Sequence, residues 1–217
     1  MGLFSRLFGR SSQDDRSYVR AWAEKRVRDI SSSSEFSVEN VFVAMTWLLS
    51  TFGKKSMRET IPPEMRGLIV DPSVDYSGDA SLFEVGCYMF SQLECWLDKH
   101  KPHQAKCIVP FAKQFVELFS QALNSRDILA LYQQRLSHYC RIYLLKDPDP
   151  EKYYFHLLQL IFRTGENETP TSYDFEHGSI TVVPFTVQTG LRFELMAWEK
   201  AVLPSVIKLI EKYCDVT

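Results

Sequence analysis

The longest regular pattern of apolar positions runs from Ser81 to Leu123 and predicts two consecutive helices. Large apolar residues recur at alternating spacings of three and four, the period that keeps one helical face toward a core. A short basic stretch, residues 100–103, separates the two series. Neither helix could remain in water alone, so we expect the pair to form the centre of the fold. The two series are Leu82, Val85, Met89, Leu93 and Trp96, then Ile108, Phe111, Phe115, Leu118, Phe119 and Ala122.

Three further segments show the same helical period around this pair. Apolar residues at that spacing predict a helix over residues 19–30 and another over residues 38–52. Ser37 precedes the second of these and is a plausible N-cap. Ser125 stands in the same relation to a helix predicted for residues 128–146. These segments are expected to cover the central pair.

The C-terminal third predicts two helices with prolines at informative positions. Pro148 and Pro150 suit the first turn of an aromatic helix over residues 153–162, which has few polar faces and should be deeply buried. The last helix is predicted to start after Gly190, with Pro204 inside it. A proline there removes one backbone hydrogen bond and should kink the helix.

Residues 171–183 change from the helical period to a period of two, which predicts a β-hairpin with its turn at residues 177–178. An isolated hairpin is only marginally stable in water, so it must pack on the helices. The expected fold class is therefore mainly α. We predict one domain, residues 15–217, that forms a bundle of six or seven helices with one small hairpin before the C-terminal helix. A mobile basic amphipathic segment and linker, residues 1–14, precede it.

Composition and charge are those of a globular protein. Of the 217 residues, 45% are hydrophobic and 24% are charged, which disfavours a disordered or fibrous chain. A chain of this length can bury enough apolar surface to fold stably without a disulfide or a bound metal. The net charge of -2 provides no global field for a polyanion, so binding of nucleic acid would need a local basic patch.

Cysteine usage indicates a reducing compartment. The five cysteines are an odd number, they fall within helical patterns, and no CxxC occurs, so we expect reduced, buried thiols. No apolar run approaches the roughly 20 residues that cross a bilayer, and the first ten residues do not form a secretory signal. These observations predict a cytoplasmic protein. The cysteines are Cys87, Cys95, Cys107, Cys140 and Cys214.

The first ten residues form a small basic amphipathic element. Four large apolar side chains lie on one side of any helix formed there, and two arginines lie on the other. Such an element suits a membrane interface or a groove on a partner protein. It could equally pack on the domain itself. The candidate contact residues are Leu3, Phe4, Arg6, Leu7, Phe8 and Arg10.

Two other stretches are candidate contact surfaces. The first predicted helix carries an excess of basic side chains, which could contact phosphates or form a solvated face. Residues 54–78 lack any helical period and contain several prolines and glycines, so they form a long connection of the kind that often carries function. The basic patch comprises Arg16, Arg20, Lys25, Arg26, Arg28, Lys54 and Lys55.

Metal binding is a weak hypothesis at the central turn. Thiol, imidazole and carboxylate side chains gather there, but three lysines would oppose a cation. The C-terminus of a helix explains histidines and lysines electrostatically without a metal. We therefore expect no metal and no cofactor. The weak candidate ligands are Cys95, Asp98, His100, His103 and Cys107.

No catalytic signature stands out. Ser137 and His138 are adjacent, but neighbouring helical residues point in different directions, and Arg135 nearby indicates a solvated edge. Glu84 and Glu94 lack the Glu-x-x-His motifs of a di-iron bundle. An enzyme is thus the less favoured class.

By elimination, the expected function is a non-enzymatic protein–protein interaction module, an accessory or adaptor subunit of a cytoplasmic assembly. Its contact surfaces would be the first ten residues, the 54–78 connection and the hairpin, and its partner would be another protein or a second copy of the chain. The first alternative is a peripheral membrane protein anchored by residues 1–10. A metal-dependent enzyme and a nucleic-acid-binding accessory protein are further alternatives.

Overall fold

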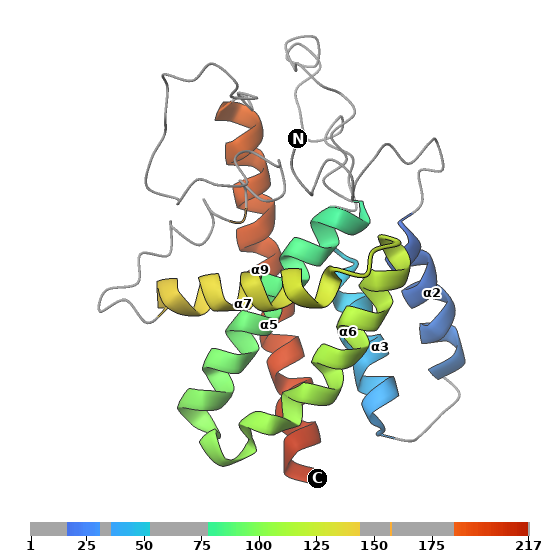
Figure 1. The fold of residues 1–217 in the computed structure, drawn as a ribbon, viewed down its shortest axis with the longest axis vertical. Helices are drawn as coiled ribbons and strands as arrows, with labels where there is room; N and C mark the ends of the chain where they lie inside the picture. The colour runs from blue at the N-terminus through green and yellow to red at the C-terminus, as the bar shows by residue number, and fades with distance from the viewer. Residues whose placement is uncertain (1–16, 31–35, 53–77, 144–156, 158–184, 217) are drawn as a thin grey trace.

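The computed structural model describes residues 17–30, 36–52, 78–143, 157 and 185–216, and within them the chain is mainly helical (Figure 1). The predicted helix at 153–162, apart from residue 157, and the predicted hairpin at 171–183 lie outside the described residues, which contain no strand. The elements are α2 (Tyr18–Ile30), α3 (Val38–Leu49), α5 (Asp79–His100), the 3-10 helix η2 (Pro102–Ile108), α6 (Val109–Ala122), α7 (Ile128–Tyr143) and α9 (Phe185–Val216).

Local signals in the sequence account for several of the helix boundaries. The Ser37 side chain accepts a hydrogen bond from the backbone N–H of Asn40 at 3.2 Å, which confirms the predicted N-cap of α3. The prediction that α9 starts after Gly190 is wrong, because the helix already begins at Phe185. A glycine inside a helix costs about 1 kcal/mol relative to alanine, and packing of the remaining turns can offset this. Pro204 lies inside α9, as predicted.

The predicted helix pair is the centre of the bundle (Figure 1). Helices α5 and α6 are joined by η2, and α7 crosses them, packing on both. Helices α2 and α3 form a second pair that lies against α6. The long C-terminal helix α9 packs on α3 and also contacts α5 and η2. Every other described helix therefore covers some part of the central pair.

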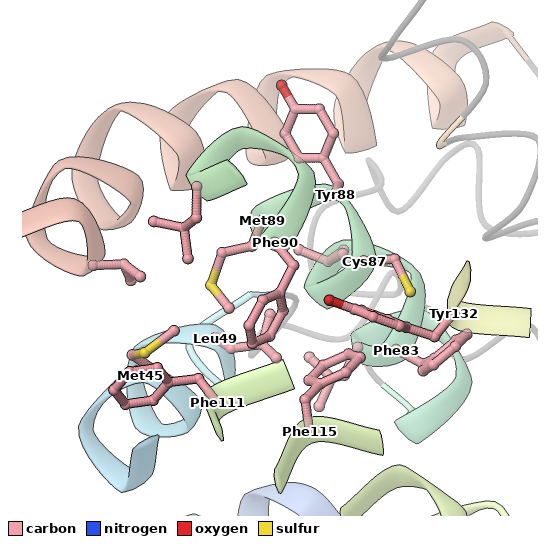
Figure 2. Close-up of a cluster of buried hydrophobic side chains, with 14 of the residues drawn as sticks. Met45, Leu49, Phe83, Cys87, Tyr88, Met89, Phe90, Phe111, Phe115 and Tyr132 are labelled. Carbon is pink, nitrogen blue, oxygen red and sulfur yellow. The ribbon is translucent and has the colours of Figure 1, made fainter. Parts of the chain in front are cut away.

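Aromatic rings fill the space between α5, α6 and α7 (Figure 2). The Phe115 ring lies at the centre, with its centroid 5.7 Å from that of Phe83, 5.0 Å from Phe90 and 5.7 Å from Tyr132. Gly86 permits this packing, because a Cβ atom at that position would lie 2.3 Å from Cε2 of Phe115. The predicted core series of α5 and α6 is confirmed, except that Trp96 and Ala122 are only partly buried.

A disulfide joins the end of α9 to the central turn. Cys107 of η2 and Cys214 of α9 are bonded, with their Cα atoms 6.1 Å apart. The prediction of five reduced thiols is therefore wrong for these two residues, and the argument for a reducing compartment loses its basis. The partners are 107 residues apart in the chain, so no local pattern could have paired them. Lys101 adds ion pairs to Glu211 and Asp215 at the same place.

None of the described helices combines the length and the apolar character needed to cross a membrane.

Candidate functional site

The first turn of α2 is capped by a residue from a distant helix. Asp79, the first residue of α5, accepts hydrogen bonds from the backbone N–H groups of Tyr18 at 2.8 Å and Val19 at 3.0 Å, and from the Ser17 hydroxyl. The first N–H groups of a helix have no partner within the helix, and a carboxylate also favours the positive end of its dipole. The cap therefore fixes the start of α2 against the start of α5.

Arg20, in the first turn of α2, forms hydrogen bonds with the backbone at the C-terminal end of α3. Its guanidinium donates hydrogen bonds to the backbone carbonyls of Ser50, at 3.0 Å, and Phe52. The last carbonyls of a helix lack partners within the helix, so a basic side chain there satisfies them and the negative end of the dipole together. Residue 52 is thereby brought next to the first turn of α2.

These two sets of bonds bring three points of the chain together at one end of the bundle. We call this the shared end and define it by Ser17, Phe52 and Gly78, which are the described residues next to segments 1–16 and 53–77. In Figure 1 the starts of α2 and α5 lie at the same end of the domain. Two of the predicted contact surfaces, residues 1–10 and the 54–78 connection, are thus attached at one place. Their own residues, up to residue 77, lie outside the described part.

Of the four residues of the predicted basic patch that the structure describes, three make contacts within the domain. Arg20 is used at the shared end, Arg26 forms an ion pair with Glu39 at 2.9 Å, and Arg28 donates to the Glu24 carbonyl at 3.1 Å. Lys25 is exposed to solvent. Arg16, Lys54 and Lys55 lie outside the described residues.

A cavity of about 240 Å³ lies between α2, α3 and α6. Its apolar wall comes from Phe42, Leu118 and the indole of Trp22, which meets the Phe42 ring edge to face with centroids 5.9 Å apart. Its polar wall carries charged and amide groups from all three helices. The polar lining residues are Arg26, Glu39, Gln114, Glu117 and Gln121.

A buried ion pair joins α5 to α7. The Arg135 guanidinium donates to both carboxylate oxygens of Glu84, with Nε–Oε2 at 3.0 Å and Nη2–Oε1 at 3.2 Å. The two side chains are only 10% and 5% exposed. The prediction that Arg135 lies at a solvated edge is therefore wrong. Residue 135 is seven positions after Ile128 and four before Tyr139, so the helical period itself places it on the buried face.

Burial controls the chemistry of the groups around this pair. It raises the pKa of the Cys87 thiol well above its ordinary value, and the negative charge of Glu84 adds to the effect. Burial followed by the charge of Glu84 likewise raises the pKa of Tyr139. A protonated thiol without solvent access is a poor nucleophile. Tyr88, one helical turn after Glu84, packs against Tyr139 with ring centroids 5.6 Å apart, points toward α9 and donates a hydrogen bond to Glu199 at 3.1 Å (Figure 2). This arrangement suits internal cohesion better than catalysis.

The weak metal candidates do not converge. Cys107 is bonded to Cys214, and the His100 imidazole lies beside the Trp96 ring with centroids 5.3 Å apart. Across the described ranges, no group of three or more His, Cys, Asp or Glu side chains is arranged to hold a metal ion. The other candidates were Cys95, Asp98 and His103.

Sequence reasoning missed both the Asp79 cap and the α2–α3–α6 cavity. Asp79 lies two residues before the predicted start of its helix at Ser81, and nothing in the local pattern relates it to the start of α2. The cavity joins residues from positions 22 to 121, and no local period relates them. Searches against family models, curated proteins and solved structures found no match for this chain.

Proposed function

We propose that the protein is a non-enzymatic interaction module that presents two contact segments, residues 1–16 and 53–77, to a partner protein from the shared end of a rigid helical domain. The observation that supports this most directly is the convergence of Ser17, Phe52 and Gly78 through the bonds of Asp79 and Arg20.

Two segments with a common origin can engage one partner together. Once the first segment binds, the second is held near its own site at a high effective concentration, which can raise the overall affinity by about 10²–10⁴ without any new contact. The apolar residues of the described helices are largely consumed in the core. Recognition is thus left to surface features and to the attached segments, among them Leu3, Phe4, Leu7 and Phe8.

The experiment compares partner binding by four forms of the full chain at native expression level. These are the natural chain, a chain lacking residues 1–10, a chain with residues 54–77 replaced by a Gly/Ser linker of equal length, and a chain with both changes. We expect the recovered amount of one partner protein to fall more than tenfold with either single change. Val109→Ser is the control, because this exposed side chain begins α6. Retention of the same partners by the doubly altered chain would refute the proposal.

The peripheral membrane alternative is supported by the basic amphipathic pattern of residues 1–10. A single short element of this kind gives only weak, reversible attachment. Sedimentation with anionic phosphatidylserine vesicles tests it. Binding by the full chain that disappears when residues 1–10 are removed would identify the membrane as the surface that this segment contacts.

A further inference from the structure

The α2–α3–α6 cavity is separate from the attached segments and has a chemistry of its own. We infer that it receives one arginine side chain of a partner protein. At about 240 Å³ it is smaller than the roughly 300–1,000 Å³ of pockets that bind drug-sized ligands. A single side chain is therefore a better fit than a cofactor.

The charges that line the cavity favour a cation. One arginine and two glutamates line it, so its formal charge is -1. Arg26 is already paired with Glu39 at 2.9 Å, whereas among the described residues the Glu117 carboxylate forms an ion pair with Lys113 alone, at a long 3.9 Å. Glu117 also keeps 59% of its side chain exposed. A negative charge is thus accessible at the mouth of the cavity.

The uncharged groups that line the cavity favour a planar hydrogen-bond donor. The side-chain oxygen of Gln114 is buried, and it accepts no hydrogen bond within the described part of the chain. A buried acceptor without a partner is costly, and an incoming N–H group would satisfy it. Trp22 supplies an indole that already has the Arg26 guanidinium over it, 5.9 Å from the ring centroid. A planar guanidinium can bind a carboxylate, an amide oxygen and an aromatic ring together, which an ammonium group does less well.

The location of the cavity agrees with a protein partner. Gln121 at its edge accepts a hydrogen bond from the Tyr18 hydroxyl at 3.2 Å, and Tyr18 follows Ser17 of the shared end. A partner that engages the attached segments would therefore lie close to the cavity. The inference rests on the proposed function only for the source of the arginine, because the chemistry of the cavity can be tested with a small molecule.

The test is an NMR titration of the full chain with N-acetyl-arginine amide, following the indole N–H signal of Trp22. The signals of Trp96 and Trp198 serve as internal references. Two control compounds, both acetylated on Nα, separate the features of the arginine side chain. The citrulline amide has nearly the same shape but no charge, and the lysine amide has the charge without the planar group. We expect a saturable shift at Trp22 with the arginine compound and a dissociation constant in the millimolar range, with weaker binding of the other two.

Two variants make the test sharper because they should change the affinity in opposite directions. Glu117→Gln removes the accessible carboxylate and should weaken binding about threefold, whereas Arg26→Gln frees Glu39 and should strengthen it about threefold. Glu24→Gln, on α2 but outside the cavity, is the matched charge control and should have no effect. A change of the same sign in the first two variants would contradict the inference. So would equal binding of the citrulline or lysine compound, or the absence of a saturable shift.

Discussion

Replacing Gly86 with alanine should have two opposing effects on the free energy of unfolding: better helix propensity and steric overlap with Phe115. Alanine is a better helix former than glycine by about 0.8–1.0 kcal/mol, so at an open position in α5 the change would stabilise the protein. At position 86 the new Cβ atom would lie 2.3 Å from Cε2 and 2.5 Å from Cζ of Phe115, and 3.3 Å from Cδ2 of Leu49. Ordinary carbon contacts are about 3.5–4.0 Å, so the ring or the helix would have to move by about 1 Å.

The surroundings of Phe115 leave little room for that movement. Its ring centroid is 4.6 Å from that of Phe119 and 5.0 Å from that of Phe90, and its side chain is almost fully buried. Overpacking of a tight core costs about 1–3 kcal/mol, and a displacement of this size belongs in the upper half of that range. After the gain in helix propensity is subtracted, Gly86→Ala should lower the free energy of unfolding by about 1–2 kcal/mol.

Urea unfolding followed by circular dichroism measures this change. With a slope of about 3 kcal/mol per molar urea, the midpoint should fall by about 0.3–0.7 M. Phe115→Leu should destabilise the natural chain but be tolerated better in combination with Gly86→Ala, since the smaller side chain makes room for the new methyl group. Ser137→Ala, at an exposed position of α7, is the control for helix propensity alone. A Gly86→Ala variant more stable than the natural protein would refute the reasoning.

Three further predictions concern groups that the fold buries or joins. Arg135→Met should cost about 3–5 kcal/mol because it removes the guanidinium that neutralises the buried Glu84 carboxylate, and adding Glu84→Leu should recover most of the loss in urea unfolding; a cost below about 1 kcal/mol would contradict this. The raised pKa of Tyr139 means that the folded state favours the protonated phenol. The contribution of this group to the free energy of unfolding is therefore complete below about pH 10, where the same phenol begins to ionise in the unfolded chain. This contribution is lost as the pH rises further. Tyr139→Phe should make the urea midpoint fall less steeply with pH in that range, and an unchanged slope would contradict the assignment. Replacing Cys214 with serine should lower the free energy of unfolding by about 2–4 kcal/mol and abolish the effect of a reducing agent, whereas equal sensitivity of both proteins to the reductant would show that the bond to Cys107 does not form.

Helical periodicity determined the local part of this structure. The apolar spacing from Ser81 to Leu123 predicted α5, α6 and most of their buried residues, because each helix must hide the face on which those residues recur. Ser37 marked the start of α3 because a hydroxyl can satisfy a backbone N–H of the first turn. The same period contained the information that Arg135 is buried, but its charge suggested a solvated position.

Tertiary structure alone decided which faces meet. Asp79 caps a helix that begins 61 residues earlier in the chain, Cys107 bonds to a residue 107 positions away, and the cavity gathers side chains from three helices. Periodicity specifies which side of a helix seeks burial, but it does not specify the partner of that side. That choice depends on the summed packing, hydrogen bonding and chain connectivity of the whole domain, so the shared end and the cavity became visible only in the folded chain.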